Sequence, residues 1–279
     1  MSKLKMWQAH PSWEAAEKSW DEGAAKASTT QPIKGLHRLP NMPGMTDDTA
    51  KHLKWKAFKW MVAKDTKWAL IRKFFKHPLS YGWGFLCSIL DKKPYLRDDD
   101  FFLYGIKHIE EFLQLLDDKS ALLVVGFSYC HKPFECPSGR FTDVCIHDPD
   151  NAVCRQCFIG KCVNALPTVN TIPLFIPTIH YIGGKILDII EAHPNRRILF
   201  LITACEMTLE MFGDLGNMVG IKGIGVRLDG RICNTLKAFE LSEEGIKPGL
   251  TVVLEPTQRR ILDLIRHWRQ NNNAINEKE

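Results

Sequence analysis

Cysteine is the residue type whose spacing in this chain most clearly predicts chemistry. The chain has nine cysteines in 279 residues, and six of them lie in one segment: Cys130, Cys136, Cys145, Cys154, Cys157 and Cys162. Where thiols are kept reduced they do not persist as structural disulfides, so clustered thiols indicate metal binding or catalysis. We predict that these six cysteines are metal ligands.

The spacing of Cys154, Cys157 and Cys162 is the most specific part of this segment. Two residues separate the first pair and four separate the second. The short gap lets two thiolates point at one ion, and the next turn can return a third. We expect Cys145 or His147 as the fourth ligand. Zinc and iron–sulfur clusters both favour thiolate. The thiols beyond the four of a structural zinc site favour one or two clusters of the 4Fe–4S type.

Three cysteines, Cys130, Cys205 and Cys233, follow β-rich runs of the chain. In open α/β sheets the carboxyl ends of the strands and the helix amino termini open on a common crevice, where ligands bind. We therefore add Cys205 and Cys233 to the metal ligands and predict that both are catalytic. Inert buried thiols are the alternative. Glu206 is predicted either as a general acid or base or as a partner of the helix dipole.

Gly183 and Gly184 form a pair at a predicted helix start. Backbone N–H groups at such a position can bind an anionic cofactor. The complete fingerprint of a dinucleotide or nucleoside-triphosphate site is missing, so packing or a turn is the alternative.

Short apolar runs alternate with helical patterns after residue 120. Strands are expected at residues 121–129, 172–176, 197–204, 223–231 and 250–254, and helices at 184–193, 206–215 and 258–270. Continuous apolar strands separated by helices predict a parallel sheet covered on both faces. We expect a Rossmann-like α/β fold with a cysteine-rich metal-binding insertion and an N-terminal helical extension. The predicted domains are residues 1–118 and 119–279.

The predicted N-terminal extension has three parts. Residues 1–50 are rich in Ala, Ser, Thr, Pro and Gly and are expected to form a loop or an extended arm. Residues 52–77 alternate basic and aromatic side chains, which suits either an anionic membrane surface or packing on the core with lysine stems outermost. Residues 101–117 are expected to form one amphipathic helix, preceded by three capping aspartates.

Composition limits the classes of protein. A hydrophobic content of 45% excludes a disordered chain, and a net charge of +5 is too small to indicate nucleic-acid binding. The amino terminus lacks the apolar run of a signal peptide, and the longest weakly polar stretch, residues 79–90, is too short to span a bilayer. We expect a cytoplasmic protein, with peripheral contact to an anionic membrane as a further expectation.

Three segments, Asn151 to Leu166, Ala204-Cys205-Glu206 and residues 231–235, together resemble the bacterial and archaeal family catalogued as domain of unknown function 116. The resemblance covers about residues 120–245. It implies an α/β domain with a cysteine-rich insertion, in which Cys154 with Cys157, Cys205 with Glu206, and Cys233 with Asn234 recur. Gly183-Gly184-Lys185 also resembles the family's glycine pair. The third cysteine departs from the pattern, because four residues separate Cys157 from Cys162 where two are expected.

Two functional hypotheses follow. In the first, the protein is an iron–sulfur enzyme of redox or sulfur-transfer chemistry, acting at the C-terminal edge of the sheet with an electron donor or a sulfur-carrying partner. In the second, it is a zinc-stabilised binding module that docks on a membrane or a protein partner. The identity of the metal separates them.

Overall fold

The computed structural model describes residues 6–36, 44–51, 53–90 and 95–273. Its centre is a six-stranded sheet in the order β1-β2-β6-β5-β3-β4. The strands are β1 (Leu96–Asp98), β2 (Phe101–Tyr104), β3 (Leu122–Ser128), β4 (Thr171–Ile176), β5 (Ile198–Ala204) and β6 (Lys222–Arg227). A separate two-stranded ribbon joins β7 (Asp229–Gly230) to β8 (Thr251–Val252).

The four strands β3, β4, β5 and β6 are parallel, and β1 and β2 extend the sheet in antiparallel pairing. The chain passes from β3 outward to β4 and then crosses back to β5 and β6. The direction of winding therefore reverses between β3 and β5, which is the switch point where open α/β sheets bind ligands. The predicted α/β class is confirmed, and the sheet includes β1 and β2 from the predicted N-terminal extension.

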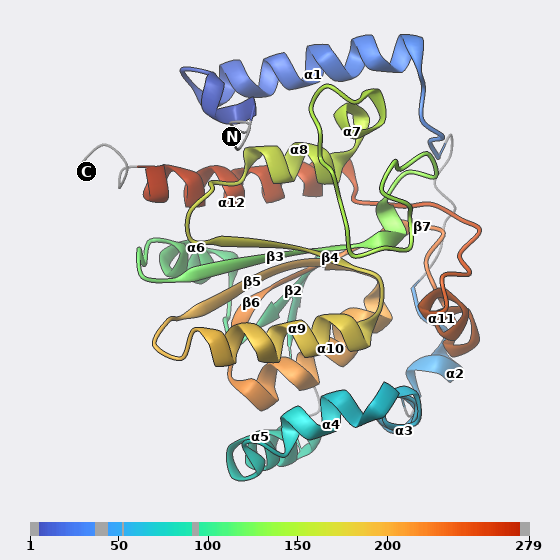
Figure 1. Ribbon diagram of the computed structural model, residues 1–279. Coiled ribbons are helices and arrows are strands. Elements are labelled where there is room, and N and C mark those ends of the chain that lie inside the picture. The colour runs from blue at the N-terminus through green and yellow to red at the C-terminus, as the bar shows by residue number, and fades with distance from the viewer. Residues whose placement is uncertain (1–5, 37–43, 52, 91–94, 274–279) are drawn as a thin grey trace.

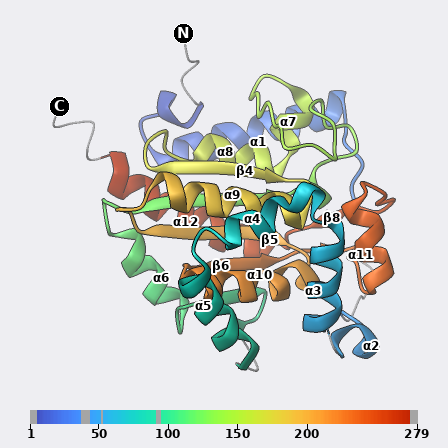
Figure 2. The ribbon, with the colours of Figure 1, turned by 60° about the horizontal axis from the view of Figure 1, so that its bottom comes forward.

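Helices cover both faces of the sheet (Figure 1). One face carries α6 (Ile109–Leu116), α8 (Phe158–Ala165) and α12 (Glu255–Asn273), with α1 (Trp13–Thr30) and α7 (Ala152–Gln156) outside them. The other carries α9 (Ile179–Ala192) and α10 (Glu206–Val219). Beyond this layer lie α3 (Leu53–Lys64), α4 (Ala69–Phe74) and α5 (Pro78–Leu90), which we call the outer helices (Figure 2).

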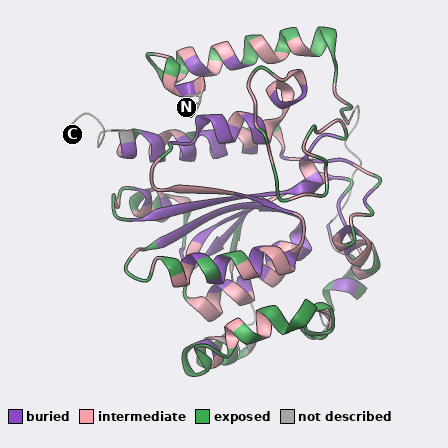
Figure 3. Cartoon of the chain, in the orientation of Figure 1, coloured by how far each residue is buried: buried purple, intermediate pink, exposed green. Residues whose placement is uncertain are grey.

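Alternating side chains of the central strands build two cores. In β3, Leu123, Val125 and Phe127 contribute to the core under α8 and α12, whereas Leu122 and Val124 face α9 and α10. Every residue of β3 and of β5 is buried, as expected for parallel strands covered on both faces. Figure 3 shows this buried sheet between partly exposed helices.

The predicted single helix over residues 101–117 is wrong. The aromatic run Phe101–Tyr104 is the fully buried strand β2, and the helix begins only at Ile109. Gly105 separates the two elements with a φ of +64°, a left-handed conformation that favours glycine. The bulky aromatic side chains suit a strand, and pairing with β6 favours the strand over the helix for this run.

The predicted loop over residues 1–50 is also wrong for much of its length. Residues 13–30 form the helix α1, whose amino end is capped by the Ser12 hydroxyl accepting from the Ala15 N–H. Alanine is the strongest helix former, and the alanines of α1 outweigh the local Ser and Thr content. Another short helix, α2 (Asp47–Ala50), follows. Residues 37–43 of the predicted loop lie outside the described residues.

The expected strand at 250–254 is short. Only Thr251 and Val252 pair, and they pair with β7 instead of joining the main sheet. Among the described residues, no helix is both long enough and apolar enough to cross a bilayer.

Candidate functional site: two thiol groups at one sheet edge

Cysteines flank the switch point of the sheet. Cys130 lies in a short 3-10 helix, η3 (Tyr129–His131), directly after β3, and Cys205 is the residue between β5 and α10. His131 joins the two strand ends, because its Nε2 atom lies 2.9 Å from the Thr203 hydroxyl. Burial lowers the pKa of His131 to about 3, so this imidazole is neutral and serves as a hydrogen-bonding group.

A third cysteine and a lysine complete the group at this edge. Cys233 follows the β7 turn, and the Lys247 ammonium donates to its sulfur at 3.2 Å. Both residues are buried. We call Cys130, Cys205 and Cys233 the edge set. The thiols of the edge set are predictable from the sequence, whereas Lys247, between α11 and β8, lies in no distinguishing motif.

The edge set and Lys247 form one electrostatic group. Burial, together with the neighbouring thiols Cys233 and Cys130, raises the pKa of the Cys205 thiol to about 12. Burial also raises the pKa of Cys130, whereas the Lys247 ammonium lowers it in part. The pKa of Lys247 is lowered by burial but raised more by the three thiols, so it stays protonated. The ammonium therefore offsets negative charge that a thiolate at this edge would carry.

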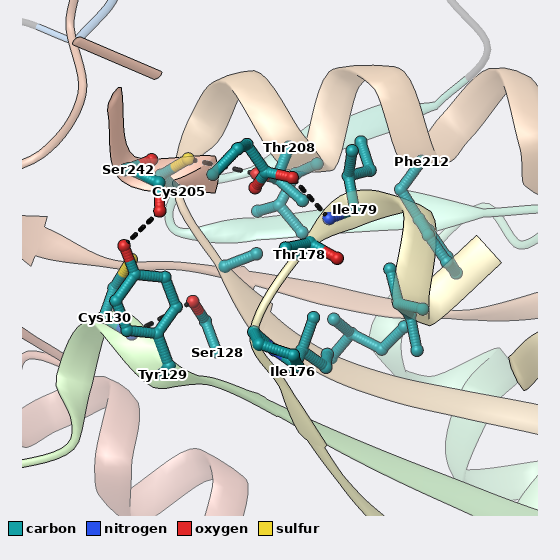
Figure 4. A pocket seen from close by; sticks show the side chains of 16 residues that line it. Ser128, Tyr129, Cys130, Ile176, Thr178, Ile179, Cys205, Thr208, Phe212 and Ser242 are labelled. Carbon is teal, nitrogen blue, oxygen red and sulfur yellow. Dashed lines mark hydrogen bonds between the residues drawn. The ribbon is translucent and has the colours of Figure 1, made fainter. Parts of the chain in front are cut away.

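A small cavity lies beside the edge set. Its volume of about 20 Å³ is enough for one water-sized group. Figure 4 shows Cys130 and Cys205 at one end of the cavity and Phe212 at the other. The Cys205 sulfur shares a hydrogen bond of 3.2 Å with the Thr208 hydroxyl. Glu243, at the end of α11 (Leu236–Glu243), lines this cavity and also a wider cleft between α9 and the outer helices.

A second group of four thiols lies in the cysteine-rich segment. Cys136 and Cys145 are in the loop before α7, Cys154 is in α7, and Cys157 lies between α7 and α8. We call these four the loop set. Burial, together with the neighbouring thiols Cys145 and Cys136, raises the pKa of Cys154 to about 11 and of Cys157 to about 12. Cys136 and Cys145 are therefore near enough to Cys154 and Cys157 for their thiolate charges to interact.

Backbone amides favour negative charge on the loop set. Hydrogen bonds from the backbone N–H groups of Gly160 and Ile159 lower the pKa of Cys157, which opposes the effect of burial. A hydrogen bond from the backbone of His147 likewise lowers the pKa of Cys145. The junction is tight, since a Cβ on Gly160 would lie 2.3 Å from the Cys154 carbonyl oxygen. N–H groups aimed at sulfur are characteristic of protein-bound clusters.

Lys132 organises the loop that carries Cys136 and Cys145. Its ammonium is buried and donates to the carbonyl oxygens of Thr142 at 2.9 Å and of Val144 at 2.8 Å. Burial lowers the pKa of Lys132, while Cys136, Cys145 and Cys157 raise it, and the net shift is downward. Lys132 thus faces the loop set as Lys247 faces the edge set.

Arg140 connects the two groups. Its guanidinium donates to the carbonyl oxygens of Cys130, Lys132, Lys247 and Gly249 at distances of 2.6 to 3.2 Å. The backbone around both buried lysines is therefore held by one side chain. Neither Arg140 nor Lys132 could be identified from the sequence, because their partners are backbone carbonyls that the fold supplies.

Two predicted members of the cysteine-rich site are placed apart from the loop set. Cys162 is fully buried in the core with Ile159 and Val163, and burial raises its pKa well above the ordinary value, with Cys157 as the nearby thiol. The His147 ring lies against its own turn, with Nδ1 2.9 Å from the Cys145 carbonyl oxygen. Cys136 and Cys145 thus influence the pKa of both Cys154 and Cys157, whereas Cys162 interacts with Cys157 from within the apolar core.

The expected roles of Glu206 and the glycine pair change with the structure. Glu206 accepts from the Arg97 guanidinium at 2.6 Å, in an ion pair that fixes the start of α10. The prediction that Gly183 and Gly184 open a helix is wrong, because α9 begins at Ile179. Their N–H groups lie inside the helix, and Gly183 lets Leu70 of α4 approach closely.

Among the residues that the structure describes, no three or more Cys, His, Asp or Glu side chains stand as a preformed metal-binding group. All nine cysteines are free thiols. The donor chemistry fits a soft metal, since the loop set offers four thiols, nearby N–H groups and a buried ammonium. Binding would require the thiols to turn toward a shared point, which couples metal binding to ordering of the loop. Comparisons with family models, curated proteins and solved structures gave no match to this chain.

Proposed function

We propose that this chain is an iron–sulfur protein that holds a cluster on the loop set and carries out redox or sulfur-transfer chemistry at the edge set. The observation that carries the proposal is the shared electrostatic neighbourhood of Cys136, Cys145, Cys154 and Cys157. Burial and the neighbouring thiols Cys145 and Cys136 raise the pKa of Cys154 and Cys157, so thiolates here are unfavourable unless a cation neutralises them.

A cluster bound at the loop set would supply one-electron transfer. The chain's own groups would make that possible in two ways. Backbone N–H groups of Ile159 and Gly160 would stabilise negative charge on the Cys157 sulfur. The Lys132 ammonium would offset part of the remaining charge while it holds the loop at Thr142 and Val144.

The edge set suits reactive chemistry because it lies at the switch point of the sheet. Lys247 would stabilise a thiolate on Cys233, and Thr208 would orient the sulfur of Cys205. Three thiols leave room for a second cluster with an open position or for transfer of a sulfur atom. An electron donor or a sulfur-carrying partner would approach this edge, and a reducing cytoplasm is the compartment in which nine free thiols persist.

The experiment is metal and sulfide analysis of the full chain after anaerobic purification. We expect a coloured protein that contains iron and acid-labile sulfide in comparable amounts. Stoichiometric zinc without iron, from cells supplied with adequate iron, would contradict the proposal. That result would favour the zinc-stabilised binding module, for which the four thiols of the loop set are also a suitable ligand set.

A further inference from the structure

The outer helices are anchored to the molecule by specific contacts. In α5, Tyr81 is buried and Gly84 lies so close to α10 that a Cβ would be 2.5 Å from the Met218 carbonyl oxygen. In α4, the Lys73 ammonium donates to the Gly184 carbonyl oxygen of α9 at 2.9 Å. In α3, the Trp60 ring packs on Phe239 at 5.3 Å. Each outer helix therefore has an inner face with a defined partner.

The opposite face of α5 is apolar and exposed. It carries Leu79, Trp83, Leu86 and Leu90, whose side chains are 89%, 71%, 55% and 83% exposed. The spacing of four, three and four residues places them on one stripe of a helix. An amphipathic helix of a globular protein places its apolar stripe toward the core, but α5 also directs one toward solvent.

The other outer helices extend this exposed apolar surface. In α3, Trp55, Phe58 and Val62 share one stripe and are 65%, 48% and 38% exposed. Trp68 and Phe75, at the two ends of α4, are 62% and 65% exposed. Of the six aromatic side chains in the basic stretch, Trp60 and Phe74 turn partly inward, whereas the other four remain at the surface. Exposed apolar side chains that gather in this number on the three outer helices mark an interaction site.

Basic side chains accompany the exposed apolar side chains of α3 and α4, whereas residues 78–90 of α5 contain no Lys or Arg. Residues 51–76 contain nine Lys and Arg against one acid, Asp65. Lys59, Lys67 and Arg72 are exposed, and within the described part of the chain no ion pair engages them. The surface therefore combines tryptophan and leucine side chains with basic groups free to meet anions.

We propose that the outer helices dock this protein on an anionic lipid surface. Tryptophan and leucine on one face, with lysine and arginine around them, is the composition of helices that lie in the membrane interface. A second copy docked face to face would set the same basic residues against one another, so charge complementarity favours lipid. The 13 residues of α5 are too few to span a bilayer, so contact would be peripheral.

The test is flotation of the full chain with vesicles of phosphatidylcholine, with and without phosphatidylglycerol. We expect flotation with the anionic vesicles only, and at least tenfold weaker partitioning when salt rises from about 0.1 M to about 1 M. The triple variant Leu79→Ser, Trp83→Ser, Leu86→Ser is expected to lower the partition coefficient at least about a hundredfold.

The matched control is Leu96→Ser, because Leu96 lies in β1 and is 50% exposed, close to the 55% of Leu86. We expect this variant to float like the original protein, and thermal unfolding of both variants checks their folding. No binding to anionic vesicles at low salt, or binding that the triple variant leaves unchanged, overturns the proposal. Self-association that the triple variant abolishes, without flotation, would instead assign the surface to a second copy.

Discussion

A buried lysine lies near each thiol group, with Lys247 in contact with the Cys233 sulfur, and the surroundings of each cysteine give it a distinct expected role. Cys157 faces Lys132 and the other thiols of the loop set, whereas Cys162 is five residues away in an apolar core. We predict that Cys157→Ala loses the metal and much of the stability, because metal binding there is coupled to folding. Cys162→Ala should keep the metal and lose about 1 to 2 kcal/mol of unfolding free energy.

Metal content and thermal unfolding of the two variants, measured side by side, check this prediction. Equal loss of metal in both would place Cys162 among the ligands, as its spacing to Cys157 first indicated.

The edge set should behave differently from the loop set. Cys205 and Cys233 come from separate strand ends and are brought together only by the folded sheet. We predict that Cys205→Ala and Cys233→Ala stay folded and retain the loop-set metal, and that each loses either the metal of the edge or turnover. Iron content per chain and complementation in the host are the measurements. A full iron complement with full function in the host would rule out a role for the edge.

Glu243 gives a pH dependence of stability. It accepts from the Ile179 N–H at 2.8 Å, and burial raises its pKa from 4.5 to about 7. Because the folded-state pKa is above the unfolded value, the folded protein binds the extra proton between these pH values. The stability conferred by this proton is fully present below about pH 4.5 and is lost as pH rises through about 7. The free energy of unfolding therefore changes by up to about 3 kcal/mol over this range.

The variant Glu243→Gln keeps an oxygen for the Ile179 N–H and removes the titration. We expect it to match the original protein near pH 4.5 and to be more stable above pH 7, as chemical denaturation at each pH would show. A difference in stability that does not change with pH would contradict this assignment.

At the scale of elements, the junction of α7 and α8 should tolerate no added atom. Gly160→Ala would force a Cβ toward the Cys154 carbonyl oxygen, so we predict a loss of about 2 kcal/mol or more and weaker metal retention. Gly82 of α5 is the control, because a Cβ there meets nothing within 4 Å. Gly82→Ala should be neutral or stabilising by up to about 1 kcal/mol. Urea unfolding of both variants tests the difference, and equal effects would refute it.

The elements differ in how far the sequence could predict them. The strands β3 and β5 were predictable, since their continuous apolar runs suit only burial on both faces. The run Phe101–Tyr104 was not, because four aromatic and aliphatic residues fit the start of a helix as well as a strand. Pairing with β6, more than 100 residues later, decides that case. The helix α1 is not predicted from the sequence, because its Ser and Thr residues favour a loop while its alanines favour a helix.

The two thiol groups are likewise only partly predictable from the sequence. The cysteines and their place at the strand ends follow from the sequence, because the carboxyl ends of parallel strands share an edge. The grouping of the loop set does not follow, since Cys136 and Cys145 lie on a loop without regular periodicity. Their approach to Cys157 depends on the carbonyl contacts of Lys132, which only the folded chain provides.

At the scale of the whole molecule, the chemistry and the exposed apolar surface belong to different regions. The thiol groups lie at the carboxyl edge of the sheet, whereas the outer helices cover α9 and α10 (Figure 2). A protein docked through the outer helices would therefore leave its thiol edge unobstructed by that contact. If both proposals hold, substitutions in the outer helices would change membrane contact without changing the thiol groups.

The four carbonyl contacts of Arg140 bear on how the protein matures. One guanidinium immobilises the backbone near Cys130 and Lys132 together with that of Lys247 and Gly249. If each thiol group binds a cluster, as proposed above, ordering this backbone for the first removes conformational entropy that the second would otherwise have to lose. In that case loading of the two thiol groups should be cooperative during reconstitution with iron and sulfide. Half-loaded chains should be scarce in native mass spectra, and Arg140→Lys, which lacks the planar fork, should make them accumulate.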